Sequence, residues 1–316
     1  MRIAFLGTPG FAVPSLEALA REGFEILAVL TQPDRPKGRG HQLTASPVKE
    51  AASRLGLPVH QPERVRRPEA LELLRGLALD AMVVVGYGQI IPQAVIDLVR
   101  LGIINVHASL LPAYRGAAPI QWAIANGETR TGVTTMRIDA GLDTGEMLLK
   151  AETGIGPEET APELSARLAG TGAALLIETM RGLAAGTIHP EKQDHAQHSL
   201  APILKKEDGL IDWRQPASRI HARARGFDPW PGAYTSFRGQ TLHILKCTPA
   251  PSGDAPTAAA PGTLLLPDRK RLLVACGDGA PLELLEVQMQ GRNRVDAASF
   301  RHGQRIGDNE RLGENA

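Results

Sequence analysis

Gly102-Ile103-Ile104-Asn105-Val106-His107 is a short apolar run that ends in an amide and an imidazole. Apolar runs of this length are typical of strands that are buried on both faces of a parallel sheet. Three earlier runs have the same character, at residues 3–6, 26–30 and 81–85. Helical patterns separate them, at residues 14–21, 47–55, 92–99, 119–126 and 160–185. The alternation predicts a Rossmann-like, doubly wound and mostly parallel α/β sheet. Within the last helical pattern, Gly170 and Gly172 favour a break.

The composition is that of a globular protein, with 316 residues of which 43% are hydrophobic and 22% are charged. Residues 1–204 carry 19 basic and 21 acidic side chains, a net of −2, and residues 205–316 carry 16 and 13, a net of +3. With a total of only +1, any nucleic-acid contact must use local patches. The first apolar run is too short for a signal peptide and no long apolar span follows, which favours a cytoplasmic enzyme without membrane contact.

The pattern changes after about residue 186, and this change predicts the domain organisation. Residues 187–204 are polar and without strong periodicity, so we interpret them as a linker. Residues 205–312 contain short strand patterns separated by turn signals, at residues 233–237, 241–247, 262–266, 272–275 and 282–287. These patterns predict a small C-terminal β-barrel or sandwich, after a catalytic domain at residues 1–186.

Neither the cysteines nor the clustered histidines predict a metal site. Cys247 and Cys276 lie far apart and form no C-x-x-C pair, so buried free thiols are expected. His189, His195 and His198 lie in the polar segment without a cysteine or carboxylate pattern around them. We therefore expect surface histidines and no metal.

Asn105 and His107 are two positions apart, so in an extended strand their side chains lie on the same face. In an open parallel sheet, ligands bind beyond the carboxyl ends of the strands, which is where this pair would lie. Asp143 follows in the turn-like segment Gly141-Leu142-Asp143-Thr144-Gly145. An amide and a protonated imidazole can donate to a developing oxyanion, and a carboxylate can orient the imidazole. The three residues predict acyl transfer in which the substrate brings its own nucleophile.

Three glycine-containing or basic segments are further candidates. Gly7-Thr8-Pro9-Gly10 follows the first strand, but its spacing does not match a dinucleotide-binding fingerprint, which disfavours a dehydrogenase. Gly86-Tyr87-Gly88 ends the third strand and is either a plain turn or a place where a flat ligand ring approaches the backbone. The loop of residues 32–40 is either a solvated loop or a grip on a phosphate backbone through Arg35, Lys37 and Arg39.

A long string then carries a resemblance to a known family. Ser109-Leu110-Leu111-Pro112 continues through Arg115-Gly116-Ala117-Ala118-Pro119-Ile120-Gln121 and resembles the tetrahydrofolate-binding signature of formyltransferases. Together with Gly7-Thr8-Pro9, residues 32–40, Asn105-x-His107 and residues 141–145, it resembles the methionyl-tRNA formyltransferase family. Downstream, residues 211–213 and 227–232 look like the opening of that family's C-terminal domain, so the resemblance spans the chain.

The resemblance implies a reaction and its participants. The N-terminal domain is expected to bind 10-formyltetrahydrofolate as co-substrate, and the formyl group is expected to pass to the α-amine of methionyl initiator tRNA, with release of tetrahydrofolate. Asn105, His107 and Asp143 are the implied catalytic residues. The implied folate-binding residues are Ser109, Leu110, Leu111 and Pro112, to which we add Gly86, Tyr87 and Gly88 as candidates.

The resemblance also implies how the tRNA is bound. Residues 32–46 match a loop that inserts by the acceptor end of the tRNA, and Arg39 matches its important arginine. The C-terminal domain matches an OB-like β-barrel that contacts the tRNA. His41 and Gln42 stand where some members have lysines, and Ala113 stands where members often have arginine. The electrostatic attraction of the tRNA is therefore expected to be either weaker here or shared with the basic C-terminal domain. We expect a monomer.

Other acceptors remain open, because the same trio and folate signature occur in formyltransferases that act on glycinamide ribonucleotide or on amino sugars attached to nucleotides. A formyltetrahydrofolate hydrolase uses similar residues with water. The tRNA prediction therefore rests on residues 117–121, the basic loop and the second domain. A catalytically silent RNA-binding protein is disfavoured by the intact trio and by the near-neutral charge.

Overall fold

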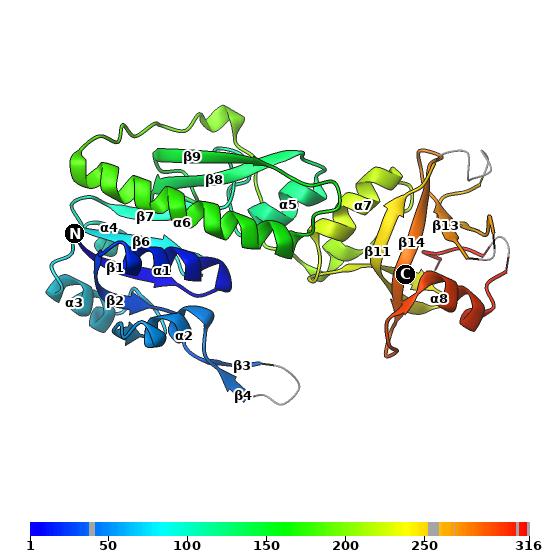
Figure 1. The fold of residues 1–316 in the computed structure, drawn as a ribbon, viewed down its shortest axis with the longest axis horizontal. Helices are drawn as coiled ribbons and strands as arrows, with labels where there is room; N and C mark the ends of the chain where they lie inside the picture. Colours follow the sequence, from blue (N-terminus) through cyan, green and yellow to red (C-terminus); the bar gives the residue numbers. More distant parts are fainter. Residues whose placement is uncertain (38–41, 252–258, 269, 308–309, 315–316) are drawn as a thin grey trace. The chain divides into compact units, whose positions relative to one another are not determined.

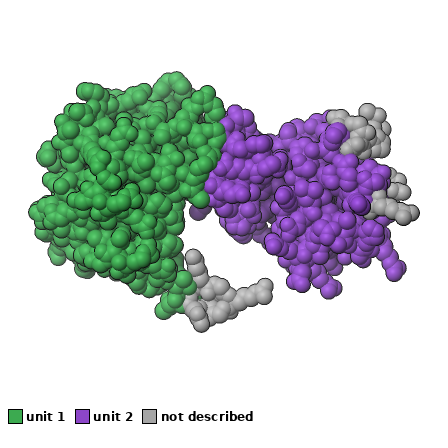
Figure 2. All heavy atoms as spheres, in the orientation of Figure 1, with its two compact units in different colours: residues 1–119, 130–154, 165–201 green, residues 120–129, 155–164, 202–316 purple. Residues whose placement is uncertain are grey.

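The computed structural model describes residues 1–37, 42–251, 259–268, 270–307 and 310–314. The chain forms two compact units, which Figure 2 shows in different colours. Unit 1 contains Met1–Pro119, Arg130–Gly154 and Ser165–Ala201. Unit 2 contains Ile120–Thr129, Ile155–Leu164 and Pro202–Ala316. Unit 2 thus takes two short segments that lie between segments of unit 1 in the sequence.

A seven-stranded sheet forms the centre of unit 1, in the order β5-β2-β1-β6-β7-β8-β9 (Figure 1). The five strands from β5 to β7 pair in parallel, and β8 and β9 continue the sheet in antiparallel fashion. The order reverses between β1 and β6, which makes the sheet doubly wound as predicted. The strands are β1 Arg2–Gly7, β2 Glu25–Leu30, β5 Val59–His60, β6 Ala81–Val85, β7 Ile103–His107, β8 Arg130–Arg137 and β9 Met147–Gly154.

Helices connect these strands close to where the sequence predicts them. Several begin with a proline in the first turn, where the missing N–H costs nothing, and Ser46 also caps α2 by accepting from the Lys49 N–H. The sequence analysis did not predict α3, and α4 is shorter than expected. The elements are η1 Gly10–Ala12, α1 Val13–Arg21, α2 Pro47–Arg54, α3 Pro68–Gly76, α4 Gln93–Ile96, α5 Pro119–Ala125 and α6 Ala161–Ala185.

The predicted break in the last of these helices is wrong, because α6 runs unbroken through Gly170 and Gly172. Figure 1 shows α6 lying along the sheet. A Cβ at position 172 would come within 2.9 Å of a methyl group of Val106 on β7. Gly172 therefore permits close packing of helix on sheet and does not end the helix.

Two strand pairs of unit 1 were not predicted. The strands β8 and β9 pair with each other after β7, and β9 alternates partly buried and exposed residues from Leu149 onward. The basic loop begins and ends as a two-stranded antiparallel sheet, formed by β3 Arg35–Lys37 and β4 Gln42–Thr44. The loop is therefore anchored at a hairpin base.

Unit 2 contains an antiparallel sheet in the order β10-β11-β14-β13-β12, with β15 paired to β14. Two of its strands, β10 and β13, have the predicted bounds. The sequence analysis missed helices α7 and α8. The elements are η3 Lys206–Gly209, α7 Ala217–Gly226, β10 Ala233–Phe237, β11 Gln240–Pro249, β12 Leu264–Leu265, β13 Leu272–Ala275, β14 Pro281–Met289, β15 Val295–Asp296 and α8 Ala297–Gln304.

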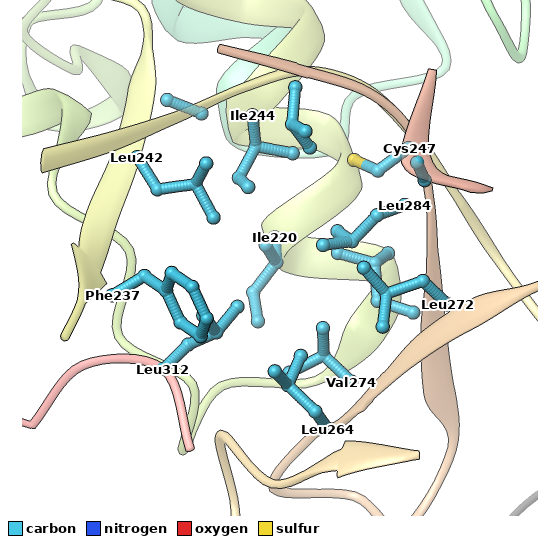
Figure 3. Close-up of a cluster of buried hydrophobic side chains, with 14 of the residues drawn as sticks. Ile220, Phe237, Leu242, Ile244, Cys247, Leu264, Leu272, Val274, Leu284 and Leu312 are labelled. Carbon is cyan, nitrogen blue, oxygen red and sulfur yellow. The ribbon is translucent and has the colours of Figure 1, made fainter. Parts of the chain in front are cut away.

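Figure 3 shows the buried core of unit 2, in which Ile220 of α7 lies among side chains from the sheet. Leu242 and Ile244 of β11 and Leu284 of β14 are at most 2% exposed. Cys247 belongs to the same cluster. Helix α7 is thus a structural part of the C-terminal domain, although its three arginines and one histidine mask its apolar face in the sequence.

Both cysteines are free and buried, as predicted. Burial raises the pKa of each thiol to about 12, so neither is a nucleophile near neutral pH. His189, His195 and His198 are exposed, which confirms the surface interpretation. Across the part of the chain that the structure describes, no cluster of three or more His, Cys, Asp or Glu side chains could hold a metal ion, and no helix could span a membrane.

Candidate active site

Asn105 and His107 lie at the carboxyl end of β7, beside the parallel strand β6. Asn105 pairs in register with Val84, so Gly86-Tyr87-Gly88 after β6 and the Asn-x-His pair end at the same edge of the sheet. The two side chains are buried, with 9% exposure for Asn105 and 6% for His107. The strand run predicted from the sequence therefore places both groups where an open α/β sheet binds ligands.

The side-chain amide of Asn105 makes no hydrogen bond to any of the residues described in the structure. The atoms of this amide are still reached by solvent, since none of them is fully enclosed without a partner. The N–H groups of Asn105 are thus available to a bound substrate. This is the donor that an oxyanion at the end of β7 would need.

Both ring nitrogens of His107 face an acceptor. Nε2 lies 2.9 Å from the Tyr114 carbonyl oxygen, and since a carbonyl only accepts, Nε2 carries the proton of that hydrogen bond. Nδ1 lies 3.7 Å from Oδ2 of Asp143, within range of a charge interaction but too long for a hydrogen bond. The structure thus brings His107 and Asp143 together, as predicted. Of the two ring nitrogens, Nδ1 therefore has the weaker contact.

The turn that carries Asp143 is shaped by local constraints. Asp139 accepts hydrogen bonds from the Gly141 N–H at 3.0 Å and from the Thr144 hydroxyl at 2.7 Å. Asp143 itself has φ +51°, a left-handed conformation that a non-glycine residue adopts at a cost. Its Oδ2 accepts from the Gly116 N–H at 2.8 Å. The carboxylate is therefore held between a backbone donor and the imidazole.

The predicted folate segment divides into buried and accessible residues. Ser109 and Leu111 are almost fully buried, and the Ser109 hydroxyl donates to the Ala113 carbonyl at 2.6 Å. Thr134 of β8 joins this segment to the sheet, because its hydroxyl donates to the Ser109 carbonyl and accepts from the Leu111 N–H. Leu110 and Pro112 are partly exposed. Ser109 and Leu111 thus fix the backbone, and Leu110 and Pro112 are the accessible residues of the four.

The Arg115-Gly116 pair connects the site to a later part of the chain, residues 190–201, here called the strap. The Arg115 N–H donates to the Ser199 carbonyl at 2.9 Å, and the Ala201 N–H donates to the Arg115 carbonyl at 2.7 Å. Gly116 has φ +123°, and a Cβ there would lie 2.5 Å from the Ala201 carbonyl oxygen. The glycine is therefore required where the strap passes.

Gln193 of the strap is a site residue that the sequence analysis missed. Its side chain is 6% exposed and contacts both Arg115 and the Asp143 turn. A single glutamine in a polar segment carries no local pattern, so only the contacts made 50 and 78 positions earlier in the chain reveal it. The short helix η2 His195–Gln197 follows it in the strap.

A cleft of about 610 Å³ lies at the point where the strand order reverses. Its walls come from Thr8, Pro9 and Gly10 after β1 and from Gly86, Tyr87 and Gly88 after β6, together with Gln32, Pro33, Arg35, Thr44, Ala45, Ser46 and Pro47. Thr8 and Gln32 both donate to the Tyr87 carbonyl, which ties the two walls together. The structure thus places the predicted glycine segment and Arg35 in one cleft, whereas Asn105, His107 and Asp143 are not among its described lining residues.

The predicted tRNA contacts are only partly visible. Arg35 is exposed, Lys37 ends β3, and Arg39 and His41 lie outside the described residues. The hairpin base is fixed by Asp34, whose carboxylate is 2.6 Å from Nζ of Lys49 and 2.7 Å from Nε2 of Gln61. These hydrogen bonds, the one from Lys49 above all, lower the pKa of Asp34. Arg35 therefore extends from a fixed base beside the cleft.

Comparison with known proteins agrees with both units. Residues 1–180 match the family described as formyl transferase, and residues 203–305 match the formyl transferase C-terminal domain. The protein of known structure described as the N-formyltransferase from Helicobacter canadensis, in complex with folinic acid and dTDP-3-aminofucose, has a similar fold, with a TM-score of 0.66, 18% identity, and coverage of 91% of this chain and 98% of that one. Fold and matches together define the class, a two-domain formyl transferase.

Curated relatives then specify the family. Methionyl-tRNA formyltransferase from Solibacter usitatus is 68% identical over 314 residues, which cover 99% of this chain and 99% of the relative. Methionyl-tRNA formyltransferase from Koribacter versatilis is 54% identical over 314 residues, again 99% of each chain. The chain therefore belongs to the methionyl-tRNA formyltransferase family.

Proposed function

We propose that this protein transfers the formyl group of 10-formyltetrahydrofolate to the α-amino group of methionyl initiator tRNA, which gives formylmethionyl-tRNA for translation initiation. The observation that best supports formyl transfer is the Asn105 amide, which makes no hydrogen bond to a described residue. It lies on the same strand end as His107, which faces Asp143. Family membership carries the choice of acceptor.

The reaction needs no protein nucleophile, because the amine of the acceptor supplies it. A fraction of α-amino groups is neutral near neutral pH and can attack the formyl carbon directly. The new C–N bond converts the carbonyl oxygen into an oxyanion, which the Asn105 amide stabilises. The amine then loses a proton, the bond between the formyl carbon and N10 breaks, and N10 takes up a proton as tetrahydrofolate leaves.

His107 and Asp143 assist in the proton transfers of this sequence. Because Nε2 of His107 is engaged by the Tyr114 carbonyl, the nitrogen that can reach the reacting atoms is Nδ1. Asp143 lies 3.7 Å from that nitrogen and stabilises the ring when it is charged. The pair is thus suited to hold a proton near the developing oxyanion and to give it up when the intermediate collapses.

The two substrates are assigned to neighbouring surfaces of unit 1. For the folate we propose contacts with Ser109, Leu110, Leu111 and Pro112 and with Gly86, Tyr87 and Gly88, in which the exposed members touch the ligand and the buried ones shape the segment. For the acceptor end of the tRNA we propose the loop cations Arg35, Lys37 and Arg39, of which Arg35 lies at the wall of the cleft that the glycine segment also lines. Phosphate contacts of this kind position the nucleic acid without reading its sequence.

The remaining parts of the chain complete this proposal. We propose a catalytic domain at residues 1–186, a linker at residues 187–204 that belongs to unit 1 as far as Ala201, and a tRNA-binding β-barrel at residues 205–312. The second part of the chain, residues 205–316, has a net charge of +3, which favours contact with a polyanion. We further propose that the protein acts as a cytoplasmic monomer.

The experiment that tests this function measures transfer of labelled formyl from 10-formyltetrahydrofolate. Methionyl initiator tRNA is the expected acceptor, and methionyl elongator tRNA, glycinamide ribonucleotide, an amino sugar nucleotide and water alone are run in parallel. Selective labelling of the initiator supports the proposal. Turnover only with a small amine or with water would retain the chemistry and overturn the acceptor.

A further inference from the structure

The strap is fixed to unit 1 on both sides of Gln193. On one side, Met147 and Glu191 exchange two backbone hydrogen bonds of 2.8 Å each. On the other side, Ser199 and Ala201 bond to the backbone of Arg115. The Tyr114 N–H also donates to the Ser199 hydroxyl at 2.9 Å. The position of Gln193 relative to the catalytic turn is therefore set by backbone contacts and not by its own side chain.

The side-chain amide of Gln193 then uses both of its ends within the site. Nε2 donates to the carbonyl oxygens of Asp143 and Gly145, each at 2.8 Å. Oε1 accepts from Nε of Arg115 at 3.0 Å and from one terminal nitrogen of the same guanidinium at 2.7 Å. Both N–H donors and the carbonyl oxygen are thus engaged, which leaves the amide no freedom to turn over.

These contacts act on the two segments that determine where the Asp143 carboxylate lies. The backbone of Asp143 is in the left-handed region, a conformation that persists only when the surroundings hold it. Gln193 binds the carbonyl of Asp143 itself and that of Gly145, two residues later. Gln193 also binds the side chain of Arg115. The next residue, Gly116, donates its N–H to the Asp143 carboxylate. One amide therefore joins the turn to the donor that orients its side chain.

We infer that Gln193 is a positioning residue for catalysis, which acts by holding the Asp143 carboxylate against His107. The inference rests on the proposed function, since it assigns Gln193 a role in that reaction. A different role is also conceivable on structural grounds, because Arg115 is 5% exposed and a buried guanidinium needs acceptors. The two roles are separable, because they use opposite ends of the same amide.

The substitution Gln193→Glu separates them. A carboxylate keeps the length of the side chain and pairs with Arg115 at least as well as the amide does. It removes both N–H donors and directs an oxygen at the carbonyls of Asp143 and Gly145. We expect the thermal midpoint to fall by a few degrees, because two carbonyl oxygens lose their donor, and the dissociation constant for folinic acid to stay close to wild type. We expect kcat for formyl transfer to fall by about 10- to 100-fold, as small displacements of a catalytic group do.

A double-mutant cycle tests whether the loss passes through Asp143. In the background of Asp143→Asn, the carboxylate that Gln193 is inferred to position is already gone. We therefore expect Gln193→Glu to lower kcat by less than about twofold in that background. A purely structural role would give the same loss in both backgrounds. Gln193→Asn, which shortens the reach by one carbon, provides a second variant for the same cycle where Gln193→Glu folds poorly.

Gln197→Glu is the matched control, because it makes the same chemical change four positions later in the strap. Gln197 is exposed and its amide donates only to the Asp194 carboxylate at 2.8 Å. Its kcat should equal that of the wild type. Wild-type kcat in Gln193→Glu, or an undiminished loss in the Asp143→Asn background, would overturn the inference. Absence of formyl transfer in the wild-type protein would instead remove the proposed function, so the two failures are distinguishable.

Discussion

In unit 1, buried polar side chains gather around the carboxyl end of β7, whereas the main buried cluster of unit 2 consists of apolar side chains and two thiols. Asn105, His107, Arg115 and Gln193 are all at most 9% exposed, and they lie on segments that meet at one edge of the sheet. The sheet of unit 2 instead packs against α7 and α8. The buried polar side chains of unit 1 thus lie at the candidate active site, and the buried apolar side chains of unit 2 hold its sheet and helices together. Substitutions in the two regions should change different quantities.

The largest expected effect is on the rate, from Asn105→Ala. The amide has no partner within the described residues, so its removal leaves no broken hydrogen bond in the free enzyme. Loss of an oxyanion donor lowers kcat by about 100- to 1,000-fold, or about 3 to 4 kcal/mol of activation free energy. The free energy of unfolding should change by less than about 1 kcal/mol. Steady-state kinetics and urea denaturation measure the two quantities, and an equal loss in both would contradict the comparison.

The opposite pattern is expected for Leu284→Ala in unit 2. Leu284 is 1% exposed in the core that Figure 3 shows, and its truncation leaves a cavity among apolar neighbours. We expect the free energy of unfolding of unit 2 to fall by about 3 kcal/mol. In the folded protein, well below its melting temperature, kcat should stay within about twofold of wild type, because the residue carries no polar group toward a substrate. A hundredfold loss of kcat in the folded variant would show that the scaffold of unit 2 takes part in the chemistry.

The same contrast explains which parts of the structure were predictable from the sequence. Four of the five parallel strands and the Asn105, His107 and Asp143 trio follow from local patterns, namely apolar runs, a two-residue spacing and a turn. Helix α7 was missed because its arginines mask the apolar face formed by Ala217, Ile220 and Ala224. Strand β9 was missed because its alternation includes charged residues on the exposed face.

Gln193 could not be predicted for a different reason. Its partners lie 50 and 78 positions earlier in the chain, and its function depends on contacts that only the folded strap creates. Arg115 and Gly116 were noticed only as part of a resemblance. The structure explains why these two residue types are needed. The strap passes too close to Gly116 for a side chain, and the Arg115 guanidinium donates to Gln193 of the strap. Long-range polar contacts are thus the part of the site that sequence patterns miss.

A smaller effect, confined to the tRNA, is expected for Arg35→Ala. Arg35 is exposed, lines the cleft and begins the hairpin that the Asp34–Lys49 ion pair anchors. Loss of one phosphate contact should weaken methionyl-tRNA binding by several-fold and reduce the slope of log affinity against log salt by about 1. Folinic acid affinity should not change. We expect the same for Arg39→Ala from the family resemblance, and an unchanged salt slope in both variants would remove the loop from the tRNA interface.

Exposed cations of unit 2 provide the control for that measurement. Arg214 is largely exposed and forms a local ion pair with Asp212. A variant such as Arg214→Ala tests whether any lost surface cation reduces the salt slope, or only those beside the cleft. An equal reduction in slope for Arg214→Ala would mean that the tRNA contacts both units with similar strength.

The smallest effect is expected at Tyr87, a buried residue of unit 1 whose hydroxyl has no partner among the residues that the structure describes. The side chain is 1% exposed, and its hydroxyl makes no hydrogen bond to any described residue. Because that hydroxyl has lost its hydration without compensation, Tyr87→Phe should leave the free energy of unfolding unchanged or raise it by up to about 1 kcal/mol. Urea denaturation at neutral pH measures this difference.

The sign of the pH dependence gives a second measurement on the same pair of proteins. Burial raises the pKa of Tyr87 from 10.0 to about 12 in the folded protein. Its contribution to stability is therefore complete below pH 10.0 and is lost as the pH rises towards about 12, because the unfolded chain ionises first. The wild type should lose stability relative to Tyr87→Phe over that interval. A constant difference in unfolding free energy across it would mean that the hydroxyl reaches solvent or a partner, and Tyr87 would then be a candidate ligand contact in the cleft.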